Sequence, residues 1–224
     1  MVVQSAASIS CIILAGGRSR RLGMDKAFLP ILGQPLIALT TRRLATLSDD
    51  LIVVTNEPGA YSALRLPARL VGDERPGQGS LMGIYSGLKE ARHSHALVVA
   101  CDMPFLSLPL LRHMATLTTG YDVVIPRLGG MLEPLHAIYG RRCLKPMAHL
   151  LSAGGHQIIA FFSQVRVRVI DEREIEAFDA DHRSFLNVNA AEDWARAQAM
   201  LADAALHNGS SVPVAAAPDE LSQV

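Results

Sequence analysis

The sequence has few of the features that mark secreted, membrane or nucleic-acid-binding proteins. Its three cysteines, Cys11, Cys101 and Cys143, form no C-x-x-C pair, so neither a disulfide framework nor a zinc knuckle is expected. No apolar run approaches the roughly 18 residues of a membrane span, and Met1–Ser10 lacks the basic start of a signal peptide. The 21 basic and 21 acidic residues cancel, so no overall field favours nucleic acid or an anionic membrane. We therefore expect a cytoplasmic protein with neither of them as a partner.

Several catalytic patterns are also missing from the sequence. The eight histidines form no H-E-x-x-H motif, which gives a zinc site little support. There is no Gly-x-Ser-x-Gly nucleophile elbow, and no cysteine lies in an electropositive loop. Covalent catalysis therefore has no support in the sequence.

What the sequence does contain is apolar residues: half of its 224 residues are hydrophobic, enough for a full core. We predict one domain over residues 10–206, preceded by a short N-terminal extension over residues 1–9. No Lys or Arg follows Arg196, and the stretch from Asn208 through Pro213 and Pro218 is typical of disorder. Residues 207–224 are therefore predicted to be a disordered tail.

Short apolar runs alternate with longer amphipathic stretches, which indicates an α/β fold. We expect a three-layer α/β/α, Rossmann-like arrangement around a mainly parallel sheet. The predicted strands are Ser10–Leu14, Leu51–Thr55, Arg69–Val71, Ala96–Ala100, Asp122–Ile125, Pro134–Tyr139 and Val165–Ile170. The predicted helices are Leu36–Leu47, Leu81–Arg92, Pro109–Leu117, Arg141–Leu151 and Ala191–Leu206. The strict alternation in Val165–Val169 predicts an edge strand.

The most informative segment, Ile12 to Lys26, begins as a buried strand and breaks at Gly16-Gly17. Four cations follow within nine residues: Arg18, Arg20, Arg21 and Lys26. Glycines at a strand's carboxyl end let backbone N–H groups approach phosphate, and the cations neutralise its charge. A tight turn with a solvated basic loop is the alternative. Neither the P-loop nor the G-x-G-x-x-G pattern fits, and the adjacent glycines disfavour a dinucleotide oxidoreductase.

Further polar residues follow other predicted strands. Asp102 lies two residues after the apolar strand Ala96–Ala100, at the end where ligands of open α/β sheets bind; it could hold a metal or cap the turn before Pro104. Asn56 follows Leu51–Thr55, where a simple turn before Pro58 is equally consistent. Asn189 is a candidate N-cap of the last helix, in a pattern resembling a capping box with Glu192.

The loop Leu14-Ala15-Gly16-Gly17-x-Ser19-x-Arg21-Leu22-Gly23-x-Asp25-Lys26 resembles the signature of nucleotidyltransferases with a sugar-nucleotide-transferase-like fold. Within them it is most similar to the molybdenum cofactor guanylyltransferases, which usually have Met at the position of Leu22. The resemblance continues through Gly79-Ser80-Leu81-Met82-Gly83, where the family usually has Pro at the position of Ser80, and through Ala100-Cys101-Asp102-Met103-Pro104. Gly130–Tyr139 and Asn187-Val188-Asn189 extend it over roughly residues 10–201.

The resemblance implies roles for individual residues. It implies a Mg²⁺-binding and catalytic role for Asp102, and catalytic cations at Arg21 and Lys26. It implies acceptor contacts at Asn187 and Asn189. The implied nucleotide-binding residues are Leu14, Ala15, Gly16, Gly17, Lys26, Asn56, Asp73, Gly79, Gly83 and Asp102. At Asn56 the register is open by one residue, and Thr55 could take that place.

The function that the resemblance implies is transfer of GMP from GTP to the phosphate of Mo-molybdopterin, with release of pyrophosphate. A downstream molybdoenzyme or its chaperone is a further expected partner. Two alternatives stay open at this point. One is a cytidylyl- or other nucleotidyltransferase of the same fold, and the other is a non-catalytic nucleotide-binding adaptor.

Overall fold

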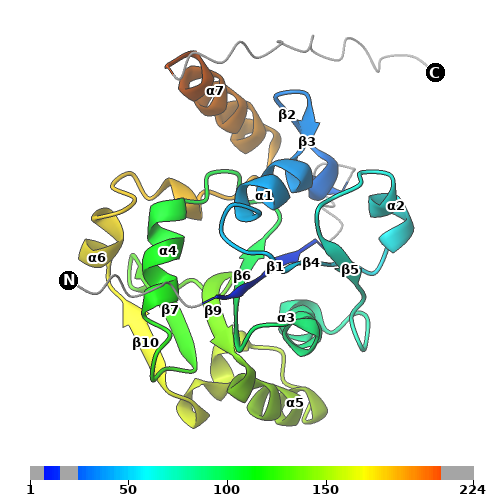
Figure 1. The fold of residues 1–224 in the computed structure, drawn as a ribbon, viewed down its shortest axis with the longest axis vertical. Helices are drawn as coiled ribbons and strands as arrows, with labels where there is room; N and C mark the ends of the chain where they lie inside the picture. Colours follow the sequence, from blue (N-terminus) through cyan, green and yellow to red (C-terminus); the bar gives the residue numbers. More distant parts are fainter. Residues whose placement is uncertain (1–7, 16–24, 208–224) are drawn as a thin grey trace.

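The computed structural model describes residues 8–15 and 25–207, which form one mainly parallel sheet covered by helices on both faces (Figure 1). The eight-stranded sheet has the order β10-β7-β9-β6-β1-β4-β5, with β8 paired to β7. Its strands are β1 (Ser10–Leu14), β4 (Leu51–Val54), β5 (Arg69–Val71), β6 (His95–Ala100), β7 (Val123–Leu128), β8 (Met131–Leu132), β9 (His136–Gly140) and β10 (Val167–Ile170). A short hairpin of β2 (Pro30–Ile31) and β3 (Gln34–Pro35) lies apart from it.

The helices are α1 (Leu36–Leu44), α2 (Pro58–Ser62), α3 (Gly79–Glu90), α4 (Leu108–Thr116), α5 (Leu144–Ser152), α6 (Glu172–Glu176) and α7 (Ala191–His207). Four 3-10 segments complete the fold: η1 (Lys26–Phe28), η2 (Arg141–Cys143), η3 (Ile158–Gln164) and η4 (Arg183–Phe185). None of the helices in the described part of the chain is long and apolar enough to cross a membrane.

Two hydrophobic clusters fill the spaces between the sheet and its helices. Ile13 of β1 belongs to the cluster beneath α1 and α4, and its neighbour Ile12 belongs to the cluster beneath α3 and α5. Adjacent residues of a strand point to opposite faces, so a strand that is apolar at every position is covered on both sides. The three-layer α/β/α prediction is confirmed.

Strand β9 runs antiparallel to both of its neighbours, β6 and β7, whereas the other pairs along the sheet are parallel. The predicted start of this strand at Pro134 is wrong. The N–H of His136 donates to the carbonyl of Glu133 at 3.0 Å, which closes a turn with Pro134 inside it. Because proline has no N–H for a sheet ladder, pairing begins at His136.

The other differences from prediction are local. The predicted helix Arg141–Leu151 divides into η2 and α5, and the predicted strand at Val165 begins only at Val167. The edge position of β10 is confirmed. The three cysteines are buried, as expected of Cys11 and Cys101. The extension over residues 1–9 and the tail over residues 207–224 lie almost wholly outside the described residues, so those boundaries stay predictions.

Candidate functional site

The carboxyl ends of β1, β4 and β6 are tied together by backbone hydrogen bonds beyond their regular pairing. The N–H of Ala15 donates to the carbonyl of Val54 at 2.9 Å, and the N–H of Cys101 donates to the carbonyl of Leu14 at 3.1 Å. The residues that follow these strands are therefore neighbours in space. Ligands of open α/β sheets bind at this edge.

A pocket of about 360 Å³ opens on one side of this edge. It is lined by Leu14, Val54, Thr55, Asn56, Asp73, Gly77, Gly79, Ser80 and Gly83. Five of these were predicted to contact a nucleotide, and Thr55, the alternative to Asn56, also lines it. The structure brings these residues together around one cavity.

Asn56 and Asp73 form the polar wall of the pocket. The Asn56 amide donates to Asp73 Oδ2 at 2.8 Å, and the Asp73 N–H donates to Asn56 Oδ1 at 3.0 Å. The remaining carboxylate oxygen, Asp73 Oδ1, is shielded from solvent and has no hydrogen-bond partner among the described residues. An unsatisfied buried oxygen is costly, so this atom is suited to a ligand's hydroxyl or N–H donor.

The N-terminus of α3 faces the same pocket. Gly79 begins the helix with φ +72°, a left-handed conformation that favours glycine. A Cβ on Gly83 would lie 3.2 Å from Leu14 Cδ2 and 3.6 Å from Asp73 Oδ1. Glycine at this position therefore lets the helix approach β1 closely. Free N–H groups at a helix N-terminus favour anions.

A second group of predicted residues forms an ion pair near the end of β6. Lys26 Nζ lies 3.0 Å from Asp102 Oδ2 and also donates to Asn189 Oδ1. The Lys26 and Asp102 side chains are 19% and 16% exposed, so the pair is shielded but open to a ligand. Lys26, Asp102 and Asn189 were predicted from a loop, a strand end and the segment before the last helix. The structure brings these three side chains together.

The capping-box prediction for Asn189 is wrong in its details. The side chain of Asn189 accepts from Lys26 instead, and the carboxylate of Asp193 accepts from the N–H groups of Asn189 and Ala190, both at 2.9 Å. Asp193, one residue after the expected Glu192, therefore closes the start of α7. The Val188 N–H donates to the carbonyl of Asp102 at 2.9 Å, which holds this segment against β6.

Not every predicted residue joins these two groups. Asn187 lines a small pocket of about 30 Å³ together with Asp193 and Arg196, so its acceptor role stays a prediction. Gly16, Gly17 and Arg21 lie outside the described residues, and their predicted roles stay predictions as well.

Two residues to which sequence reasoning assigned no role, Tyr61 and Asp25, support the site. Tyr61 of α2 donates from its hydroxyl to Asp25 Oδ2 at 2.7 Å and to the Ala15 carbonyl at 3.3 Å. Asp25 caps η1 by accepting from the Ala27 N–H at 3.0 Å. Burial and the neighbouring Asp25 raise the pKa of Tyr61, which keeps its hydroxyl a donor. Aspartate is a common cap residue, so the sequence Asp25-Lys26-Ala27 is compatible with this cap, but nothing in the sequence indicates the role of Tyr61.

The buried groups around the site argue against a nucleophilic side chain. Burial and the charge of Asp102 raise the pKa of Cys101, so its thiol stays protonated. Burial lowers the pKa of His136 to about 4, and this side chain is neutral and shielded from solvent. This edge of the sheet therefore carries a cavity lined by groups that can bind an anion or accept a hydrogen bond, next to a lysine and a carboxylate.

Residues 11–168 match the family described as the MobA-like NTP transferase domain. The chain belongs to this family. It is similar to the molybdenum cofactor guanylyltransferase of Desulfosudis oleivorans, at 37% identity over 87% of this chain and 96% of that protein. It is 36% identical to that of Syntrophotalea carbinolica, over 83% of this chain and 88% of the relative.

Solved structures agree with the sequence match. The crystal structure of molybdopterin-guanine dinucleotide biosynthesis protein A from Archaeoglobus fulgidus superposes with a TM-score of 0.77 at 25% identity. It covers 87% of this chain and all of the other. The fold is thus that of the nucleotide-diphospho-sugar transferases, and the chain is a nucleotidyltransferase.

Proposed function

We propose that this protein transfers GMP from GTP to the terminal phosphate of Mo-molybdopterin, releasing pyrophosphate and forming the guanine dinucleotide cofactor. The observation that carries the proposal is the Lys26–Asp102 pair beside the pocket of Asn56 and Asp73. These groups lie at the ligand-binding edge of a chain whose relatives are named guanylyltransferases.

The pocket would hold the nucleoside part of GTP. Asp73 Oδ1 can accept a hydrogen bond from a ribose hydroxyl, which would satisfy this buried oxygen. The N-terminus of α3 and the segment Leu14–Gly17 would supply N–H groups to phosphate oxygens. In this arrangement Asn56, Gly79 and Gly83 would shape the nucleotide pocket.

The reaction needs position and charge neutralisation more than a covalent intermediate. An oxygen of the acceptor phosphate attacks the α-phosphorus of GTP. The bond from that phosphorus to the bridging oxygen breaks, and pyrophosphate leaves. The acceptor phosphate is already anionic, so no general base is required. Lys26 and Arg21 would neutralise charge that accumulates on the triphosphate, while Asn189 holds Lys26 in place.

Asp102 would hold a Mg²⁺ ion. Mg²⁺ typically takes one or two carboxylates plus substrate phosphates, which fits a single partly exposed carboxylate at the phosphate edge. The ion, when bound, would withdraw charge from the phosphate oxygens. Acceptor contacts are assigned to Asn187 and Asn189. A downstream molybdoenzyme or its chaperone would receive the product in the cytoplasm.

Thermal denaturation with Mg²⁺ and each of GTP, CTP, ATP and NAD tests the nucleotide assignment. Ligand at 100 times its dissociation constant adds about 2.7 kcal/mol, a rise of roughly 5–10 °C in Tm for a domain of this size. We expect the shift with GTP and its loss in Asp102→Ala. A shift with CTP alone would point to a cytidylyltransferase instead. GTP binding without pyrophosphate release, even with acceptor present, would point to an adaptor.

A further inference from the structure

A second pocket, of about 500 Å³, lies at the opposite edge of the sheet from the nucleotide site. It is bounded by the amino ends of β6 and β7, the carboxyl end of β9 and the residue before β10, represented by His95, Asp122, Gly140 and Arg166. In a parallel sheet the amino ends lie at the edge away from the carboxyl ends. The pocket is therefore separate from the pocket of Asn56 and Asp73.

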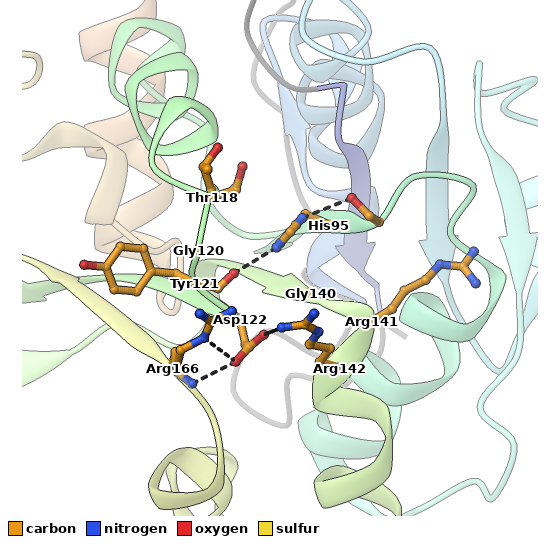
Figure 2. A pocket seen from close by; sticks show the side chains of 11 residues that line it. His95, Thr118, Gly120, Tyr121, Asp122, Gly140, Arg141, Arg142 and Arg166 are labelled. Atoms are coloured by element: carbon orange, nitrogen blue, oxygen red, sulfur yellow. Dashed lines mark hydrogen bonds and ion pairs between the residues drawn. The ribbon is translucent and has the colours of Figure 1, made fainter.

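Two arginines converge on a single carboxylate in this pocket, as Figure 2 shows. Arg142 Nη1 lies 3.8 Å from Asp122 Oδ1, and Arg166 Nε lies 3.7 Å from Asp122 Oδ2. Both separations exceed hydrogen-bond length, so the guanidinium donors are not consumed by Asp122. Among the described residues, Asp122 is the only carboxylate within ion-pair distance of either arginine. Two positive charges thus face one negative charge.

The arginines are accessible, whereas the polar groups beneath them are paired. The Arg142 and Arg166 side chains are 77% and 59% exposed, and that of Asp122 is 11% exposed. The Gly140 N–H donates to the Asp122 carbonyl at 2.7 Å, and Asp122 Oδ2 accepts the Arg166 N–H at 2.9 Å. His95 Nε2 lies 3.0 Å from the Tyr121 carbonyl. A ligand that enters from the exposed side of the pocket would therefore meet the guanidinium groups of Arg142 and Arg166.

Arg141, the third arginine of the lining, serves the scaffold. Its guanidinium donates to the carbonyls of Ala91 and His93, and its side chain points away from the other two in Figure 2. The lining thus carries three guanidinium groups against one carboxylate, in a protein whose total charge is zero, and the guanidinium groups of Arg142 and Arg166 are the two that face Asp122. Planar guanidinium forks match the tetrahedral oxygens of phosphate.

We propose that this amino-edge pocket is a second anion site, in which Arg142 and Arg166 bind a phosphate group of a small ligand. The two guanidinium groups approach the pocket from different segments, η2 and the residue before β10, and can contact different oxygens of one phosphate. Asp122 holds them in position from below. The proposal does not depend on the reaction assigned to the carboxyl edge.

Residue-resolved NMR on the full chain tests the site, with inorganic phosphate as the probe at constant ionic strength. We expect saturable shifts of the Gly120, Tyr121 and Gly140 amides. These are to be distinguished from shifts of Gly79 and Ser80, which report the nucleotide pocket. Arg142→Gln and Arg166→Gln are each expected to weaken the amino-edge binding at least tenfold, and Arg173→Gln, an exposed arginine of α6, to leave it unchanged.

Several results would overturn the proposal. These are the absence of saturable shifts at the three amides, shifts that chloride reproduces at equal ionic strength, or binding that survives both arginine substitutions. Shifts with an oligoglutamate peptide but not with phosphate would replace the phosphate ligand by an acidic protein segment. Because Arg142 is largely exposed, Arg142→Gln should keep the wild-type Tm, so lost binding reports the site and not unfolding.

Discussion

Asp50 and Asp102 lie at opposite edges of the sheet, and their carboxylates differ in burial and in the number of hydrogen bonds that they accept. Asp50, at the amino edge, is 1% exposed and accepts hydrogen bonds from Ser10 Oγ, Arg69 Nη2 and the Arg92 N–H, at 2.6, 2.8 and 2.8 Å. Asp102, at the carboxyl edge, is 16% exposed and pairs with Lys26. A carboxylate saturated with donors stabilises the fold, and one that keeps an accessible oxygen can bind a ligand.

The electrostatics of Asp50 support this distinction. Burial alone would raise its pKa, but the bonds from Ser10, the Arg92 N–H and Arg69 outweigh burial and lower it. Its ionised form therefore contributes stability above the usual carboxyl pKa, and that contribution is lost as pH falls through the lowered value. The same residue type thus has a structural role at one edge and a proposed catalytic role at the other.

The largest expected effect is on catalysis at the carboxyl edge. Lys26→Ala and Asp102→Ala should each lower GTP-dependent pyrophosphate release at least a hundredfold. This corresponds to about 3 kcal/mol of lost transition-state stabilisation. Circular dichroism should show an unchanged fold, because both side chains are partly exposed. Wild-type turnover in either variant would refute the roles assigned to these residues.

The reciprocal experiment is Asp50→Asn at the amino edge. Removing the charge leaves Arg69 and the other donors without their ionic acceptor, so we expect a loss of about 3 kcal/mol in the free energy of unfolding. That is a fall of roughly 6–12 °C in Tm, measurable by calorimetry. Asp49→Asn, in which the neighbouring exposed carboxylate is changed, is the matched control and should shift Tm little. An unchanged Tm in Asp50→Asn would show that the Asp50 carboxylate does not stabilise the fold.

As the pH falls, the buried His136 should lower the free energy of unfolding before Asp50 is protonated. Burial lowers the pKa of His136 to about 4, whereas the unfolded chain has the ordinary value near 6.5. The unfolded state therefore binds more protons between these values, and stability falls as pH drops from about 6.5 to 4. The total is about 3 kcal/mol. Urea unfolding of wild type and His136→Leu across this range checks it, and the variant should show a flatter dependence.

A smaller effect is expected at Tyr61, which supports the start of η1. Tyr61→Phe removes the donor to Asp25 and to the Ala15 carbonyl, at a cost of about 1 kcal/mol in unfolding free energy. Because the ring still packs on Phe28 at a centroid distance of 4.8 Å, the fold should persist. Denaturant titration measures the loss. A variant as stable as wild type would show that these hydrogen bonds contribute little.

The sequence predicted best those features that depend on one segment. Asp102 was proposed because a carboxylate lies two residues after an apolar strand, and Lys26 because it belongs to a glycine-rich basic loop. The parallel sheet and its edge strand followed from hydrophobic periodicity, since burial on one or both faces leaves a readable pattern.

Features that depend on distant segments were not predictable in this way. The bond from Lys26 to Asn189 joins residues 163 positions apart, and the Asp50 network joins a strand, a loop and a helix end. Asp50 follows Asp49 in what looks like a solvated turn, and only the fold separates the buried carboxylate from the exposed one. Hydrophobic periodicity predicts which face of a helix or strand is buried, but not which polar groups meet there.

The most direct test of the central claim is pyrophosphate release from GTP with Mg²⁺ and Mo-molybdopterin, compared between Asp102→Asn and Asp50→Asn well below the Tm of both. Asp102→Asn is predicted to lose at least about a hundredfold in rate while keeping its Tm. Asp50→Asn is predicted to keep the wild-type rate while losing several degrees in Tm. Equal rates in the two variants, or the reverse order, would contradict the division between a catalytic Asp102 and a structural Asp50.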